Sequence, residues 1–310
     1  MSPEKPYTPP TAIRRRLITA AVGIQSESPD QIAFQHSLLC QVGLPRKETA
    51  AREFTRVNGA LSLSIEAGRL FDGTQFVPQP LPYGARPRLI LVHISSEAIR
   101  TRSPVVEVGN SAYGFMKTLG FGVNGESYRQ TRKQVLALSA CTMTLGFMAN
   151  GFPQTVKTAP IRKFEAWLQR EGDHTIVWPG ILELSPEFFA SLQEHAVPLD
   201  PIALKSLRHS SLALDVYTWL SQRLCRVERL DGVKVSWRAL HNQFGQELAD
   251  VNNFRRKMLG TPKVPGVLAQ VKAVYPNARF ETIHGGLLLK PSAPPITKSA
   301  MDISMPKSGG

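Results

Sequence analysis

The sequence is poor in cysteine. It contains three, Cys40, Cys141 and Cys225, and no two of them form a CxxC pair. A small, odd and scattered set excludes a disulfide framework and a cysteine-based zinc site, and it is typical of a reducing cytoplasm.

Long apolar segments are also missing. The uncharged run Gln134–Gln154 is interrupted by serine, threonine and asparagine, which argues against a membrane span. The first ten residues, MSPEKPYTPP, hold no apolar core of a signal peptide. We therefore expect a protein of the bacterial cytoplasm that makes no contact with a membrane.

The motifs of common catalytic sites are absent as well. There is no GxxxxGK[ST] phosphate loop, no HExxH and no HxH pair, so neither ATP hydrolysis nor metal-dependent DNA nicking is expected. Gly120–Gly125 spells GxGxxG, but residues 127–164 hold no acid to bind a ribose, and we interpret these glycines as turn residues. His93 and His209 are interpreted as structural. The sequence predicts a non-enzyme without catalytic residue, metal or cofactor.

Acidic residues are scarce relative to basic ones. The chain has 37 lysines and arginines against 24 aspartates and glutamates, which gives a formal net charge of +13. Two windows, Ser127–Phe164 and Val251–Phe280, contain no acid at all. An excess of this size favours a polyanionic partner such as DNA.

The first acid-free window lies in a predicted helix-turn-helix at Gly109–Leu138. Asn110 and Ser111 can cap its first helix, which stops at Gly120, while Ser127 and Gln130 form a capping box for the second. At about 100° per residue, the basic side chains of the second helix point away from its apolar side. Its expected DNA contacts are Tyr128, Arg129, Gln130, Arg132 and Lys133.

The surrounding elements predict a winged-helix domain over residues 81–184. A helix from Arg86 and a strand from Val105 precede the two helices, and the segments CTMTLGFM and TIVWPGILELS are expected to pair as the wing. Residues 31–80 form a small N-terminal segment with a hairpin at Asn58-Gly59 and a turn at Asp72-Gly73. Residues 1–30, with Arg14, Arg15 and Arg16, are expected to be a flexible basic tail.

The same order of elements recurs over residues 185–290. A long helix, SSLALDVYTWLSQRL, precedes the strand GVKVS and a helix that Ser236 caps and Gly245 ends. A basic segment and a hairpin across Gly285-Gly286 follow. The fold expected is therefore α+β, with tandem winged-helix domains and a disordered tail over residues 291–310. The second set of predicted DNA contacts is Asn252, Asn253, Arg255, Arg256, Lys257 and Lys263.

Several long strings run through the chain in order: FQHSLLCQVGLPR, SLSIEAG, LPYGARPRLILVHISSEAIRTRS, VPLDPIALKSLRHSSLALDVYTWLSQRL, VSWRALHNQFGQ, AVYPNAR and GGLLLKPSAPP. Over residues 31–295 the sequence thereby resembles the plasmid-encoded RepA-type replication initiator proteins. The resemblance implies two winged helices that bind direct repeats in double-stranded origin DNA and melt adjacent AT-rich DNA. It also implies recruitment of the host replication initiator and helicase, and self-association as a dimer.

One segment departs from the family's pattern, which carries Asn253–Tyr275 as one helix. Here Gly260, Pro262 and Pro265 are expected to break the helix near Leu259 and restart it at Pro265. A short helix with a flexible loop would hold side chains less firmly against bases. Base reading is therefore expected from the first domain, and base or phosphate contact remains open for the second.

A second function uses the same predicted domains, because a sequence-specific transcriptional repressor would also need two DNA-binding winged helices. The sequence does not separate it from an initiator. An origin-nicking endonuclease would need a paired histidine motif, which is absent.

Overall fold

The computed structural model describes residues 11–26, 31–107, 112–149, 151–171 and 174–296. These residues form a mixture of helices and strands, which confirms the predicted α+β class. No helix in these ranges is both long and apolar enough to cross a membrane.

The first helical unit contains a helix, a strand, two helices and a hairpin. Its elements are α3 (Ala85–Thr101), β6 (Val105–Glu107), α4 (Ala112–Thr118), α5 (Gly125–Ala140), β9 (Lys163–Glu171) and β10 (His174–Glu183). The strands lie in the order β6-β10-β9, so the single strand pairs with the second strand of the hairpin. Gly120 ends the α4 turn with φ +71°, while the predicted caps Asn110 and Ser111 fall outside the described residues.

The second helical unit repeats this order. It consists of α8 (Ser211–Arg223), β12 (Val233–Ser236), α9 (Trp237–Leu240) with a π-helical turn (His241–Gly245), α10 (Val251–Leu259), α11 (Val267–Val274), β13 (Phe280–Ile283) and β14 (Gly286–Leu289). The strand order, β12-β14-β13, matches that of the first unit. Ser236 caps α9 by accepting a hydrogen bond from the Ala239 amide at 3.1 Å, as expected.

The predicted wing of the first domain is wrong in its pairing. The segment CTMTLGFM forms β7 (Thr142–Ala149), which pairs with β8 (Phe152–Thr158) and with β3 (Leu61–Glu66), whereas β10 pairs with β9 and β6. Gly151, with φ +81°, turns the chain back immediately after β7 and brings a nearer partner into register. The hairpin β7–β8 is therefore an insertion that joins β2 (Glu53–Asn58) and β3 in a four-stranded sheet.

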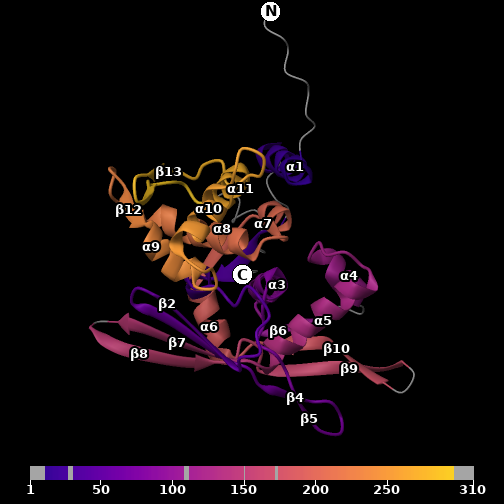
Figure 1. The fold of residues 1–310 in the computed structure, drawn as a ribbon. Coiled ribbons are helices and arrows are strands. Elements are labelled where there is room, and N and C mark those ends of the chain that lie inside the picture. Colours follow the sequence, from indigo (N-terminus) through magenta and orange to yellow (C-terminus); the bar gives the residue numbers. More distant parts are fainter. Residues whose placement is uncertain (1–10, 27–30, 108–111, 150, 172–173, 297–310) are drawn as a thin grey trace, which may run out of the picture.

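Shorter elements join the N-terminal segment to the rest. They are α2 (Ser37–Gln41), β4 (Arg69–Phe71), β5 (Phe76–Pro78), β1 (Ala33–His36), α6 (Pro186–His195), β11 (Ala196–Leu199), α7 (Pro201–Leu207) and the 3-10 turn Leu224–Arg226. The strand β1 pairs with β11, so segments on either side of the first unit meet. Figure 1 shows the four-stranded sheet and the β9–β10 hairpin extending on opposite sides, below the helices.

The expected flexible tail over residues 1–30 is wrong for its middle part, which forms α1 (Ala12–Ser26). Leu17 and Ala20 of this helix are buried, and Ile13 and Ile24 pack beside them. These apolar residues recur at helical spacing on both sides of the arginines, a pattern that the basic triplet obscured. Residues 1–10 and 27–30 lie outside the described part of the chain.

The expected disordered tail over residues 291–310 is wrong at its start. Ile296 is buried against Ile32 and Phe34. Tyr275 also donates a hydrogen bond from its hydroxyl to the Ala293 carbonyl at 2.6 Å. Residues 291–296 are therefore held against the body of the protein, and residues 297–310 lie outside the described ranges.

A buried ion pair joins the two helical units. Arg88 of α3 donates from Nε and Nη2 to the Asp215 carboxylate of α8, at 2.6 and 2.8 Å. The same guanidinium donates to the carbonyls of Leu44, Pro45 and Gly84. Because both charged side chains are more than nine-tenths buried, this contact fixes α3, α8 and the N-terminal segment together.

Candidate nucleic-acid interface

Helix α5 begins three residues earlier than predicted. Asn124, not Ser127, is its N-cap, and the Asn124 side chain accepts a hydrogen bond from the Ser127 amide at 2.8 Å. Ser127 is buried inside the helix, where its hydroxyl accepts from Arg86, so the predicted capping box is wrong. Asn124 has the extended backbone of an N-cap, and a cap at that position leaves the Ser127 side chain for tertiary contact.

Two of the predicted DNA contacts lie together at the exposed start of α5. Arg129 and Gln130 both donate to the Glu126 carboxylate, at 2.8 and 3.0 Å. The hydrogen bonds from Gln130 and Arg129 lower the pKa of Glu126. Glu126 immediately precedes the acid-free window, and it holds both side chains in defined positions on the outer surface.

The remaining predicted contacts on α5 are half-buried, as Gln130 is, so that Arg129 alone of the five is exposed. Lys133 is half-buried and bonded to Glu48, which also accepts from the Tyr83 hydroxyl at 2.9 Å. The hydrogen bond to Glu48 raises the pKa of Lys133. Tyr128 and Arg132 are also half-buried, and Tyr128 packs against the hydrophobic core. Residue spacing placed these side chains on the helix correctly, but Glu48 and Tyr83 come from a distant segment.

Helix α10 carries most of the second predicted set. Asp250 caps it by accepting from the Asn253 amide at 2.7 Å, and Asn253 Oδ1 accepts from Arg256 Nη2 at 2.6 Å. Phe254 and Met258 bury one side of the helix. The exposed side presents Asn252, Arg255, Arg256 and Lys257. Figure 1 shows α5 and α10 well apart, so the two predicted sets form separate surfaces.

The predicted break after Leu259 is confirmed, although the loop differs from expectation. Gly260 adopts φ +76°, and α11 restarts at Val267, two residues after Pro265. The connection is a hydrogen-bonded turn: the Thr261 amide donates to the Val264 carbonyl at 2.9 Å. Arg14 of α1 also donates to the Pro262 carbonyl at 2.8 Å, and Lys263 is exposed at the tip. The turn therefore holds α10 against α11 and α1.

The sequence reasoning missed two cations that border α10. Arg46 and Lys47, from the N-terminal segment, line a cleft of about 520 Å³ together with Arg256 and Lys257 of α10. Burial and then the charges of Arg46, Lys47 and Arg256 lower the pKa of Lys257. The adjacent basic residues in Pro45-Arg46-Lys47 are the signal in the sequence for this cluster. The neighbouring sequence does not predict that they lie beside α10.

Negative charge near this cleft is limited. Glu247 pairs with Arg46 at 3.0 Å and with the buried Arg56 at 3.1 Å. Within the described residues, Arg255 and Lys257 have no hydrogen-bond or ion-pair partner. The α10 surface is therefore a cluster of cations that repel one another, a distribution suited to a polyanion. Among the same residues no group of three or more His, Cys, Asp or Glu could hold a metal ion.

Comparison with known proteins gives one family. The sequence model of the family described as "Plasmid encoded RepA protein" matches residues 81–238. These residues make up just over half of the chain, from the start of the predicted first domain into α9. Helix α10 and its cations therefore lie beyond the matched residues. No curated protein matches the chain.

Two solved structures of another protein, RctB, overlap with the fold in part. A crystal structure of selenomethionine derivatives of its domains 2 and 3 is 11% identical, covers 81% of this chain and 95% of that chain, and has a TM-score of 0.49. A second structure of RctB domains 2-3 is 10% identical, covers 72% and 80%, and has a TM-score of 0.48. We draw no functional conclusion from overlaps of this size.

Proposed function

Because the chain belongs to the plasmid-encoded RepA protein family, we propose that it is a plasmid replication initiator that binds repeated sequences at its origin. In this proposal the protein opens adjacent DNA and recruits the host replication initiator and helicase. It acts in the bacterial cytoplasm as a DNA-binding protein rather than as an enzyme, and self-association as a dimer is part of the proposal.

The repeated topology supports two DNA-binding units of the winged-helix type. In each unit a helix and a strand precede two or more helices and a hairpin, and the first strand pairs with the last. A helix-turn-helix of this kind places its second helix in the major groove. We assign α5 to that position in the first unit and α10 to the corresponding position in the second.

The observation that carries the proposal is the unneutralised positive charge on α10. Asn252, Arg255, Arg256 and Lys257 are exposed on one side of a helix whose other side is buried. The exposed Lys47 extends the charge across the neighbouring cleft, whereas Arg46 is paired with Glu247. Phosphate contacts by arginine and lysine supply much of the affinity of proteins for DNA, whatever the base sequence.

The two helices, α5 and α10, are expected to contact different parts of the DNA. On α5, Glu126 fixes Arg129 and Gln130 beside one another, an arrangement suited to paired hydrogen bonds with base edges. Contact with guanine would require Arg129 to exchange its bond with Glu126. On α10, the crowded cations favour phosphate, which accepts contacts from any of them. We therefore propose that α5 contacts base edges and that α10 contacts the phosphate backbone of the DNA.

Substitution of one arginine on each helix tests this division. Arg129→Ala is expected to weaken specific binding and relax the preference at one or two positions of the repeat, by about 1–3 kcal/mol of discrimination. Arg256→Ala is expected to weaken binding to all sequences nearly equally and to lower the salt slope by about one unit. The measurement is competition binding with single-base variants of the repeat.

Arg69→Ala is the matched control, since Arg69 is an exposed arginine on β4. Its neighbour Gly68 packs against Ala140, at the opposite end of α5 from Arg129. This substitution should change neither affinity nor preference. Relaxed preference in Arg256→Ala together with unchanged preference in Arg129→Ala would reverse the two roles.

A further inference from the structure

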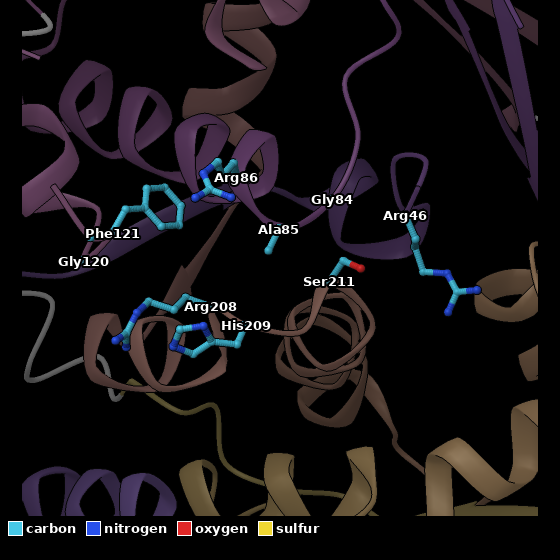
Figure 2. Close-up of a pocket in the computed structure, with 10 residues that line it drawn as sticks. Arg46, Gly84, Ala85, Arg86, Gly120, Phe121, Arg208, His209 and Ser211 are labelled. Carbon is cyan, nitrogen blue, oxygen red and sulfur yellow. The ribbon is translucent and has the colours of Figure 1, made fainter. Parts of the chain in front are cut away.

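A second basic pocket lies between the two helical units. It has a volume of about 410 Å³ and is bounded by the start of α3, the α4–α5 turn and the α7–α8 junction. Figure 2 shows Arg86 and Phe121 on one side, with Arg208 and His209 opposite them. Arg46, His209 and Ser211 also line the α10 cleft, so the pocket and the cleft adjoin.

The basic side chains of this pocket form no close ion pair, although the charge of Glu126 acts on Arg86. Among the described residues, none of the ion pairs within 4.0 Å involves Arg86, Arg208, His209 or the neighbouring Arg16. Burial and then Arg208, Arg16 and Arg86 lower the pKa of His209. Burial and then Arg208 lower the pKa of Arg16. The positive groups therefore destabilise one another, and an anion among them would relieve that repulsion.

The pocket is also built to present donors. Arg86 is half-buried: its Nε donates to Thr131 at 3.2 Å, its Nη2 donates to Ser127 at 3.1 Å, and its guanidinium lies 5.0 Å from the Phe121 ring centroid. These contacts fix the guanidinium and leave Nη1 without a partner among the described residues. On the opposite side Arg208 uses Nη1 to bond the Lys205 carbonyl at 2.6 Å, which fixes its side chain.

The start of α3 adds a further favourable feature. Its N-cap is Gly84, which provides no side-chain hydrogen bond to the first turn, and Gly84 and Ala85 both line the pocket. The positive end of the α3 dipole therefore borders the same pocket as the arginines.

We propose that this pocket binds a phosphate group, which bridges Arg86 of the first unit and Arg208, immediately before the second unit. Guanidinium groups match phosphate oxygens with strong, charge-assisted hydrogen bonds. A phosphate held by both would tie the α4–α5 turn to the α7–α8 junction and so set the spacing between the two units. The phosphate comes either from the DNA backbone, a source that rests on the proposed function, or from free phosphate in solution.

The first arm of the test uses the full chain and inorganic phosphate without DNA. Calorimetric titration at constant ionic strength should show saturable binding. Arg208→Gln should weaken it by about tenfold or more, because hydrogen bonds to a charged group are lost. Arg86→Gln is a second variant with the same expected loss if Arg208→Gln fails to fold, and Arg69→Gln is the control of equal charge change.

The second arm measures the salt slope of DNA binding for the same variants. A slope lowered by about one unit in Arg208→Gln, with competition by phosphate, identifies the DNA backbone as the source. Loss of phosphate binding with an unchanged slope identifies free phosphate instead. The proposal is overturned if wild type binds no phosphate and the slope of Arg208→Gln equals that of wild type. Failure of the proposed function would instead remove DNA binding and leave the calorimetric result intact.

Discussion

Binding to origin repeats should lose about 10³–10⁵-fold in affinity between about 50 and 200 mM salt, if roughly 6–10 phosphates are contacted. Each neutralised phosphate releases counterions, so affinity falls steeply as salt rises. The exposed Arg255, Arg256 and Lys257 on α10, with the exposed Lys47 across the cleft, supply much of this contact. Fluorescence anisotropy with a labelled repeat duplex over a salt series measures the slope.

A charge-matched pair of variants locates the effect. Arg255→Gln should lower the slope by about one unit, because Arg255 has no competing partner among the described residues. Arg229→Gln removes the same charge from an exposed arginine that pairs with Asp231 at 2.7 Å, and should leave the slope unchanged. A flat salt titration of wild type would rule out the nucleic-acid interface.

The second large effect concerns stability. Asp215→Ala is expected to lower the free energy of unfolding by about 3–5 kcal/mol, because it leaves the buried Arg88 guanidinium without its counterion. Arg88 would keep its bonds to backbone carbonyls, which carry only partial charge. Urea unfolding followed by circular dichroism measures the change.

Asp231→Ala is the control for this prediction, since it breaks an exposed ion pair with Arg229 and should not change stability measurably. A value for Asp215→Ala within about 0.5 kcal/mol of wild type would show that the Arg88–Asp215 contact does not hold the units together.

Local signals in the sequence predicted local structure well. Asn58-Gly59 and Gly285 form the expected hairpin turns, with positive φ at both glycines. The break after Leu259 follows from Gly260 and the two prolines, whose backbone cannot continue the helix. These features depend on neighbouring residues alone, so periodicity and turn chemistry were sufficient.

Contacts between distant segments could not be predicted in the same way. Strand β7 is an alternating strand, but alternation does not specify a partner, and β3 and β8 take the place assigned to β10. In the same way Glu48 reaches Lys133, and Arg46 lies opposite Lys257, through folding of the N-terminal segment. The candidate site could be predicted as a set of basic side chains, while the acids and cations around them could not.

Plasmid maintenance tests the central claim most directly. A plasmid whose only origin is this gene with its upstream repeat array should replicate in a suitable host with the wild-type gene. It should be lost when the gene carries Arg129→Ala together with Arg255→Gln, whereas Arg229→Gln should have no effect. Loss of the plasmid with the wild-type gene, while the purified protein binds the same repeats tightly, would contradict an initiator and favour a repressor.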